Sequence, residues 1–154
     1  MMNLKLAPAN ALGVAPSIDS LSAVAVTLTN RAALPLPPGS VQVNGNFWPN
    51  GASYAGDVTL SWAHRNRTAQ SGFAIVPQDA ASVGSPEGNY TVDVLIAGTV
   101  KRTARGIVGT SFTYTHAMRF ADDPDLSKTV QFRITPVNGA LVGNARTTDS
   151  FRMS

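Results

Sequence analysis

The side chains that could carry out acid–base, nucleophilic or metal chemistry are few in this chain and lie far apart. Histidine occurs twice, at His64 and His116, and neither has a histidine or cysteine partner at the spacing that zinc sites use. His64, Asp93 and a serine could be imagined as a nucleophilic site, but no Gly-x-Ser-x-Gly segment frames them. We therefore predict that the protein is not an enzyme, with no catalytic residue, no cofactor and no zinc site.

Three carboxylates cluster at Asp122, Asp123 and Asp125. With help from loop carbonyls they could bind Ca²⁺, which is coordinated by oxygen atoms. Such a cluster is more often part of a solvated loop, and the segment from Ala117 to Asp125 is expected to form a helical turn or a crossover loop. The sequence therefore predicts no metal site here.

The candidate interaction residues are Trp48, Arg65, Arg67, Phe73 and Ile75. Trp48 lies among turn residues, so we expect its ring to be partly exposed. Arg65 and Arg67 are two positions apart and would point to the same side of a continuing strand. They are either ordinary solvated or ion-paired arginines, or an anchor for acidic neighbours.

Phe73 and Ile75 belong to a short apolar run inside the longest irregular stretch, which extends from about Asn66 to Asn89. Loops of this length in a compact domain are usually functional or stabilised by a partner. The run either packs against the edge of the domain or forms a patch that meets another subunit. We expect the function to depend on this loop and on the N-terminal arm.

The composition is that of a globular protein with a surface poor in charge. Charged residues make up 14% of the 154 residues, against roughly 25% in average soluble proteins. This indicates either a surface partly covered by partners or a β surface rich in Thr, Ser and Asn. The net charge of +3 comes without a dense basic run, so we expect no nucleic-acid partner. Cysteine is absent, and neither a signal peptide nor a spanning stretch of roughly 18 apolar residues is predicted.

The chain divides into an N-terminal arm or linker (1–39) and a domain (40–154). Residues 34–39 (Leu-Pro-Leu-Pro-Pro-Gly) form a stiff connector, because each proline fixes its own φ and restricts the preceding residue. Within the arm, the segment around Val24 and Val26 is β-prone. That strand either packs on the main domain as an edge strand or adds to the sheet of a neighbouring subunit.

From Ser40 onward the pattern is all-β, because apolar and polar residues alternate as they do when one face of a strand is buried. The alternating apolar positions are Val58, Leu60 and Trp62; Tyr90, Val92 and Val94; Phe112 and Tyr114; and Val130, Phe132 and Ile134. Turn residues such as Asn44-Gly45 and Asn138-Gly139 separate the strands. We expect Trp62 in the core and a solvated edge strand from Thr99 to Arg105.

Trp62 in one strand, Tyr90-x-Val-x-Val in the next, and Leu126 followed six residues later by Phe132 resemble the pattern of fibronectin type III domains. The resemblance implies an antiparallel, immunoglobulin-like β-sandwich with an extended N-terminal arm. Phe132 stands where the family has the tyrosine of its tyrosine corner, so the hydroxyl bond of that corner cannot form. Residues 136–143 (Pro-Val-Asn-Gly-Ala-Leu-Val-Gly) are similar to the turn into the last strand of such modules.

A narrower resemblance is carried by an ordered set of motifs. They are residues 36–45 (Leu-Pro-Pro-Gly-Ser-Val-Gln-Val-Asn-Gly), 56–67 (Gly-Asp-Val-Thr-Leu-Ser-Trp-Ala-His-Arg-Asn-Arg), 86–90 (Pro-Glu-Gly-Asn-Tyr), 100–103 (Val-Lys-Arg-Thr) and 112–115 (Phe-Thr-Tyr-Thr). Together they are similar to a module of tail proteins in long-tailed bacteriophages and related prophages, over roughly residues 35–153. The resemblance implies a structural component of the tail tip, hub or baseplate, as a small free-standing relative or a fragment.

This resemblance implies a protein of the virion that is assembled in the host cytoplasm, in several symmetric copies, with other phage tail proteins as partners. The alternative is a module of the tail that binds a host-surface glycan or receptor through the loops at one end. A glycan site would need two or three exposed aromatic side chains on one face, and the sequence offers Trp48, Tyr54 and Phe73. Membrane insertion is expected in neither case.

Overall fold

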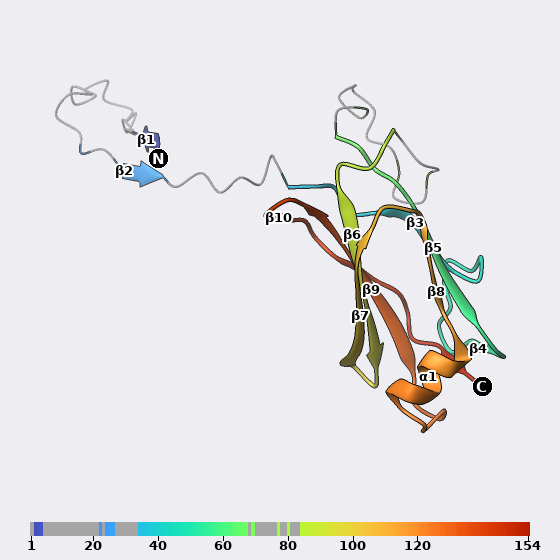
Figure 1. Cartoon of the computed structure of the whole chain (residues 1–154). Helices are drawn as coiled ribbons and strands as arrows, with labels where there is room; N and C mark the ends of the chain where they lie inside the picture. Colours follow the sequence, from blue (N-terminus) through green and yellow to red (C-terminus); the bar gives the residue numbers. More distant parts are fainter. Residues whose placement is uncertain are drawn as a thin grey trace, which may run out of the picture. The chain divides into compact units, whose positions relative to one another are not determined.

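The computed structural model describes residues 2–4, 22, 24–26, 34–67, 69, 77, 80 and 84–154. It divides the chain into two compact units, Met1–Ala33 and Leu34–Ser154 (Figure 1). The proline-rich connector therefore belongs to the second unit. In the first unit, β1 (Met2–Leu4) pairs antiparallel with β2 (Val24–Val26), so a strand is present where the sequence predicts one.

The second unit is built mostly from antiparallel strands, as the sequence predicts. One sheet has the order β10-β9-β6-β7, with β11 also on β9, and contains β6 (Asn89–Ile96), β7 (Thr99–Ile107), β9 (Val130–Asn138), β10 (Leu141–Val142) and β11 (Arg146–Thr147). The other has the order β3-β5-β8, with β3 (Gly39–Val43), β5 (Val58–Ala63) and β8 (Ser111–Tyr114). The remaining elements are the helix α1 (His116–Asp122) and two short strands that pair in parallel, β4 (Ser53–Tyr54) and β12 (Arg152–Met153).

The two larger sheets meet across the hydrophobic core. Trp62 of β5 contacts Tyr90 of β6 with ring centroids 5.4 Å apart, and Phe112 of β8 contacts Phe132 of β9 at 6.4 Å. Every second residue is buried along β6, and the same holds along β9 as far as Pro136. This is the period expected of a strand with one face in the core. Trp62 keeps only 4% of its surface exposed, so its predicted place in the core is confirmed.

A tight hairpin joins β6 to β7. Its turn residues, Ala97 and Gly98, have φ angles of 48° and 79°. Two central residues with positive φ give the turn whose twist matches that of the paired strands. β7 then forms the edge of its sheet, with most of its side chains exposed, which confirms the solvated edge strand predicted for Thr99 to Arg105.

Candidate functional site

The connector that leads into β3 has a single main-chain donor within its run of prolines. Pro35, Pro37 and Pro38 have no N–H, so Leu36 alone can donate from this run. The N–H of Leu36 donates to Glu87 Oε2 at 2.9 Å. Because the acceptor is a carboxylate, this hydrogen bond is of the stronger, charge-assisted kind.

Glu87 and Arg67 hold the same connector at a second point. Glu87 Oε1 accepts the main-chain N–H of Arg67, and the Arg67 guanidinium donates to the carbonyl oxygen of Leu34. One carboxylate and one guanidinium therefore hold Leu34 and Leu36, the residues on either side of Pro35.

Gly143, just after β10, contacts the connector from another direction. A Cβ at this position would lie 2.2 Å from the carbonyl oxygen of Pro35 and 2.9 Å from Cγ of Pro136. Both separations are too short for a carbon atom, so glycine is required unless the connector shifts. We call residues 34–39, Arg67, Glu87 and Gly143 the root clamp, because together they fix the chain where it enters the second unit.

The structure places the two candidate arginines within contacts of the chain itself. Arg67 belongs to the root clamp, and Arg65 is half-buried and has a partner of its own. Phe73 and Ile75 lie outside the described residues. A role for these four side chains in contacts with other subunits stays a prediction.

His64 forms a packing contact with Tyr90. The two rings stack with centroids 5.7 Å apart and planes at 13°, and His64 Nδ1 lies 3.1 Å from the Tyr90 hydroxyl. Burial lowers the pKa of His64, and burial together with the charge of Glu87 raises the pKa of Tyr90 to about 12. Both rings are therefore mainly neutral at pH 7, and their arrangement is that of a stacked aromatic pair.

Of the two forms predicted for Ala117 to Asp125, a helical turn or a crossover loop, the structure has the helix α1, which ends at Asp122. The hydroxyl of Thr115 accepts the N–H of Met118 at 3.1 Å, which caps the start of the helix. At its end, Asp122 accepts from the Tyr114 hydroxyl at 2.7 Å and from two nitrogens of Arg102 at 2.8 Å. Burial and the hydrogen bond to Asp122 raise the pKa of Tyr114, so its phenol stays protonated.

Asp123 and Asp125 are also engaged by neighbouring side chains. Asp123 forms an ion pair with Lys128 at 2.9 Å, and Asp125 accepts from the hydroxyl of Ser127 at 2.6 Å.

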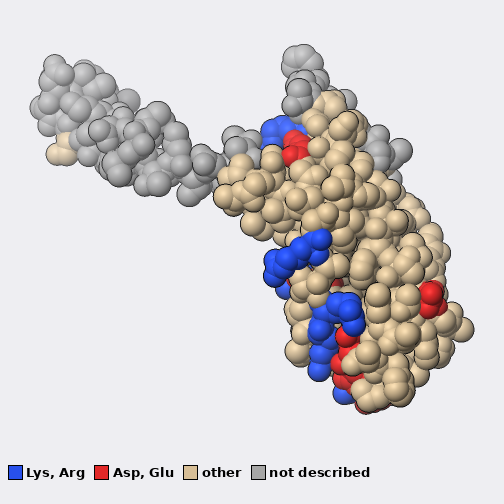
Figure 2. Space-filling view, in the orientation of Figure 1, with Lys and Arg blue, Asp and Glu red and all other residues tan. Residues whose placement is uncertain are grey.

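In Figure 2, basic side chains lie next to acidic ones, while most of the visible face is uncharged. Within the described ranges, no group of three His, Cys, Asp or Glu side chains is arranged to hold a metal ion.

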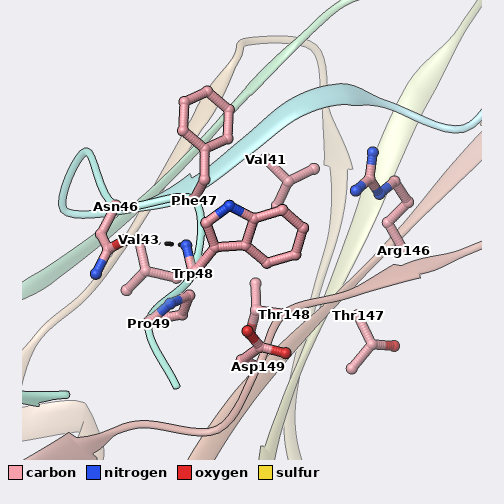
Figure 3. Close-up of a pocket in the computed structure, with 10 residues that line it drawn as sticks. All are labelled: Val41, Val43, Asn46, Phe47, Trp48, Pro49, Arg146, Thr147, Thr148 and Asp149. Carbon is pink, nitrogen blue, oxygen red and sulfur yellow. Dashed lines mark hydrogen bonds between the residues drawn. The ribbon is translucent and has the colours of Figure 1, made fainter. Parts of the chain in front are cut away.

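A shallow hollow lies beside β3, where the loop after this strand faces the segment that contains β11 (Figure 3). Its volume is about 50 Å³. The residues that line it are Val41, Val43, Asn46, Phe47, Trp48, Pro49, Arg146, Thr147, Thr148 and Asp149. We call it the Trp48 hollow, because Trp48 exposes 72% of its surface there, which confirms the exposure predicted for this ring.

Phe47 joins Trp48 in exposing its ring, with 38% of its surface accessible. Phe47 is not among the interaction residues predicted from the sequence, although its place in the same turn as Trp48 is a usable signal. Tyr54, by contrast, packs on the core: its hydroxyl donates to the Val43 carbonyl at 3.3 Å, and its ring meets Phe151 edge-on at 5.6 Å. The exposed aromatic pair is therefore Phe47 and Trp48, and Tyr54 does not belong to it.

No protein-family model matches this chain, and no curated protein matches it. The helix in the described part of the chain is not long and apolar enough to cross a membrane. The described residues thus define a mostly β protein with a short helix and two candidate functional regions, the root clamp and the Trp48 hollow.

Proposed function

We propose that this protein is a structural component of a phage tail tip or baseplate, in which a fibronectin type III-like sandwich mediates assembly contacts between tail subunits. In this proposal it is not an enzyme and does not bind nucleic acid. It acts in the virion, in several symmetric copies, after assembly in the host cytoplasm.

The root clamp is the observation that carries this proposal. Three of its members come from segments that carry the resemblance to the tail module: Leu36 from residues 36–45, Arg67 from 56–67 and Glu87 from 86–90. The fourth, Gly143, comes from residues 136–143, which resemble fibronectin type III modules. If these motifs belong to one fold, their residues should lie close together in the folded protein. These four segments, distant in the sequence, meet around the connector.

The clamp also suits a protein that works as a spacer. Prolines make the connector stiff, and Glu87 and Arg67 attach it to the body of the domain. A displacement of the preceding chain would then be passed to the sandwich instead of being absorbed by a loose linker. This rigidity is useful in an assembly whose subunits must keep a fixed spacing.

The surface of the second unit is compatible with cover by neighbouring subunits. Among the residues that the structure describes, the exposed large hydrophobic side chains are Phe47, Trp48, Val100, Val108, Phe120 and Val142. The centres of protein interfaces are poor in charge and rich in aromatic residues. Together with the 14% of charged residues, these side chains favour a subunit that is partly enclosed in an assembly.

Deleting the gene in the strain that encodes this protein tests the proposal. Particles purified from the parent and the deletion strain would be compared by electron microscopy and by quantitative mass spectrometry. We expect the protein in parental particles at a fixed ratio to other tail proteins, and no complete tails in the deletion strain. Complete tails without the protein, or parental particles that lack it, would contradict the proposal.

Point variants supplied to the deletion strain test the role of the clamp. Arg67→Ala removes the guanidinium that binds Leu34, whereas Arg105→Ala removes an exposed arginine of β7. We expect Arg67→Ala to give fewer complete tails and Arg105→Ala to restore the parental yield. Equal yields from the two variants would show that assembly does not need the clamp.

A further inference from the structure

The Trp48 hollow resembles a preformed binding site for a single ring of a ligand. Trp48 is the most exposed of the large hydrophobic side chains that the structure describes. The loop that carries it is fixed locally, because Asn46 Oδ1 accepts the N–H of Trp48 at 2.9 Å, the main chains of Val43 and Asn46 pair, and Pro49 is buried. Because the main chain of this loop is already ordered, a ligand that binds to Trp48 does not have to order the loop.

The hollow is too shallow to enclose a ligand. Its volume of about 50 Å³ is far below the roughly 300–1,000 Å³ of pockets that enclose a drug-sized ligand. An occupant would therefore lie against the surface of the hollow and not inside a closed pocket. What the hollow offers is the flat face of an indole beside a shallow depression (Figure 3).

The rim of the hollow is polar and balanced in charge. Asn46, Thr147 and Asp149 supply carboxamide, hydroxyl and carboxylate groups, and Arg146 adds a guanidinium. Arg146 has a partner within the protein, so it is not a free cation that would select an anion. A rim of donors and acceptors without excess charge matches a neutral ligand that carries several hydroxyl groups.

We propose that the Trp48 hollow binds a neutral hexopyranose residue of a glycan. The C–H groups on one face of the sugar ring would stack on the indole, whose face carries partial negative charge. The sugar hydroxyls would donate to the Asp149 carboxylate and exchange hydrogen bonds with Thr147 and Asn46. This site goes beyond the role in tail assembly and does not depend on it, since it is argued only from the residues that line the hollow.

Saturation-transfer NMR on the full chain tests this directly, with methyl β-D-glucopyranoside, methyl β-D-galactopyranoside and N-acetylglucosamine as probes. We expect transfer to the ring protons of at least one probe at millimolar concentration. Trp48→Ala should remove the transfer, corresponding to at least about a tenfold loss of affinity. Absence of transfer for all three probes, or transfer that survives in Trp48→Ala, would overturn the proposal.

Two further variants distinguish a specific binding site from non-specific binding and from loss of folding. Phe120→Ala removes another exposed aromatic ring, 58% exposed on α1, and should leave the transfer unchanged. Asp149→Asn keeps the shape of the rim and should weaken binding, because the amide is a poorer acceptor for sugar hydroxyls. The emission of buried Trp62 reports folding in every variant. Equal binding by wild type and Asp149→Asn, or equal losses in Trp48→Ala and Phe120→Ala, would also overturn the proposal.

Discussion

Arg119 is a cation buried completely in the second unit, and its hydrogen bonds explain how it is tolerated there. Its guanidinium donates to the main-chain carbonyls of Asp123, of Asp125 at 2.6 Å and of Lys128 at 3.4 Å. A buried charge is stable only when it is paired or hydrogen-bonded. Arg119 therefore organises the loop between α1 and β9 by serving as its common donor.

Replacing Arg119 by alanine should lower the free energy of unfolding by about 3 kcal/mol, because buried carbonyls lose their donor and a cavity remains. Urea denaturation followed by tryptophan fluorescence measures this change. Arg105→Ala, at an exposed position of β7, is the control and should cost less than about 0.5 kcal/mol. If the two variants lost equal stability, the loop would be held by other contacts.

Asp93 links its own strand, β6, to both neighbouring strands, β7 and β9, on the exposed face of the larger sheet. It accepts from Thr103 at 2.6 Å and from Arg133 at 2.7 Å. Burial opposes ionisation of this carboxyl, but the hydrogen bonds from Thr103 and Arg133 outweigh it and hold the pKa of Asp93 below its usual value. A carboxyl whose pKa is lower in the folded state than in the unfolded state stabilises the fold at pH values above its unfolded pKa of about 3.9. This stabilisation is lost as the pH falls through the folded pKa.

We therefore expect Asp93→Asn to be less stable than the wild type by about 1 kcal/mol at pH 7, since the ion pair is only partly shielded from water. The difference should shrink as the pH falls through the folded pKa of Asp93, where its carboxyl becomes protonated. Urea titrations at pH 7 and at successively lower pH measure the difference. A difference that does not change with pH would mean that the charge of Asp93 does not contribute.

At the scale of elements, the root clamp attaches the connector before β3 to the segment after β10. Gly143→Ala should lower the free energy of unfolding by about 1–3 kcal/mol, because the added methyl group meets the carbonyl of Pro35. Gly109→Ala is the matched control: nothing lies within 4 Å of its added Cβ, and its effect should stay within about 1 kcal/mol. If Gly143→Ala and Gly109→Ala unfolded at the same midpoint, the close packing at Gly143 would not contribute to the stability of the clamp.

The strands could be predicted from the sequence because their signal is local. The alternation at Tyr90, Val92 and Val94 records which face is buried, and this is independent of what the strand faces. Trp62 was placed correctly for the same reason.

The clamp and the hollow depend on contacts that no local pattern contains. Leu36 and Glu87 are 51 residues apart, and nothing in the sequence brings Asp149 beside Trp48. The prolines around Leu36 predict a stiff connector, but they do not identify Glu87 as the acceptor of the Leu36 N–H.

At the scale of the whole molecule, the core residues that the structure describes all belong to the second unit and run from Val41 to Met153. We expect residues 34–154 expressed alone to fold with a Tm within about 3 °C of the full chain, which corresponds to less than about 1 kcal/mol for a domain of this size. Thermal unfolding by circular dichroism compares the two.

A shorter fragment, residues 41–154, separates the core from the clamp. It keeps every core residue in the described part of the chain but lacks the connector, so Glu87 loses Leu36 as a donor and Gly143 no longer packs on Pro35. This fragment should be less stable than residues 34–154 by about 2 kcal/mol or more, because a charge-assisted hydrogen bond and the start of β3 are removed. Equal stability of the two fragments would show that the connector is only a tether. An unfolded 34–154 fragment would instead show that residues 1–33 complete the core.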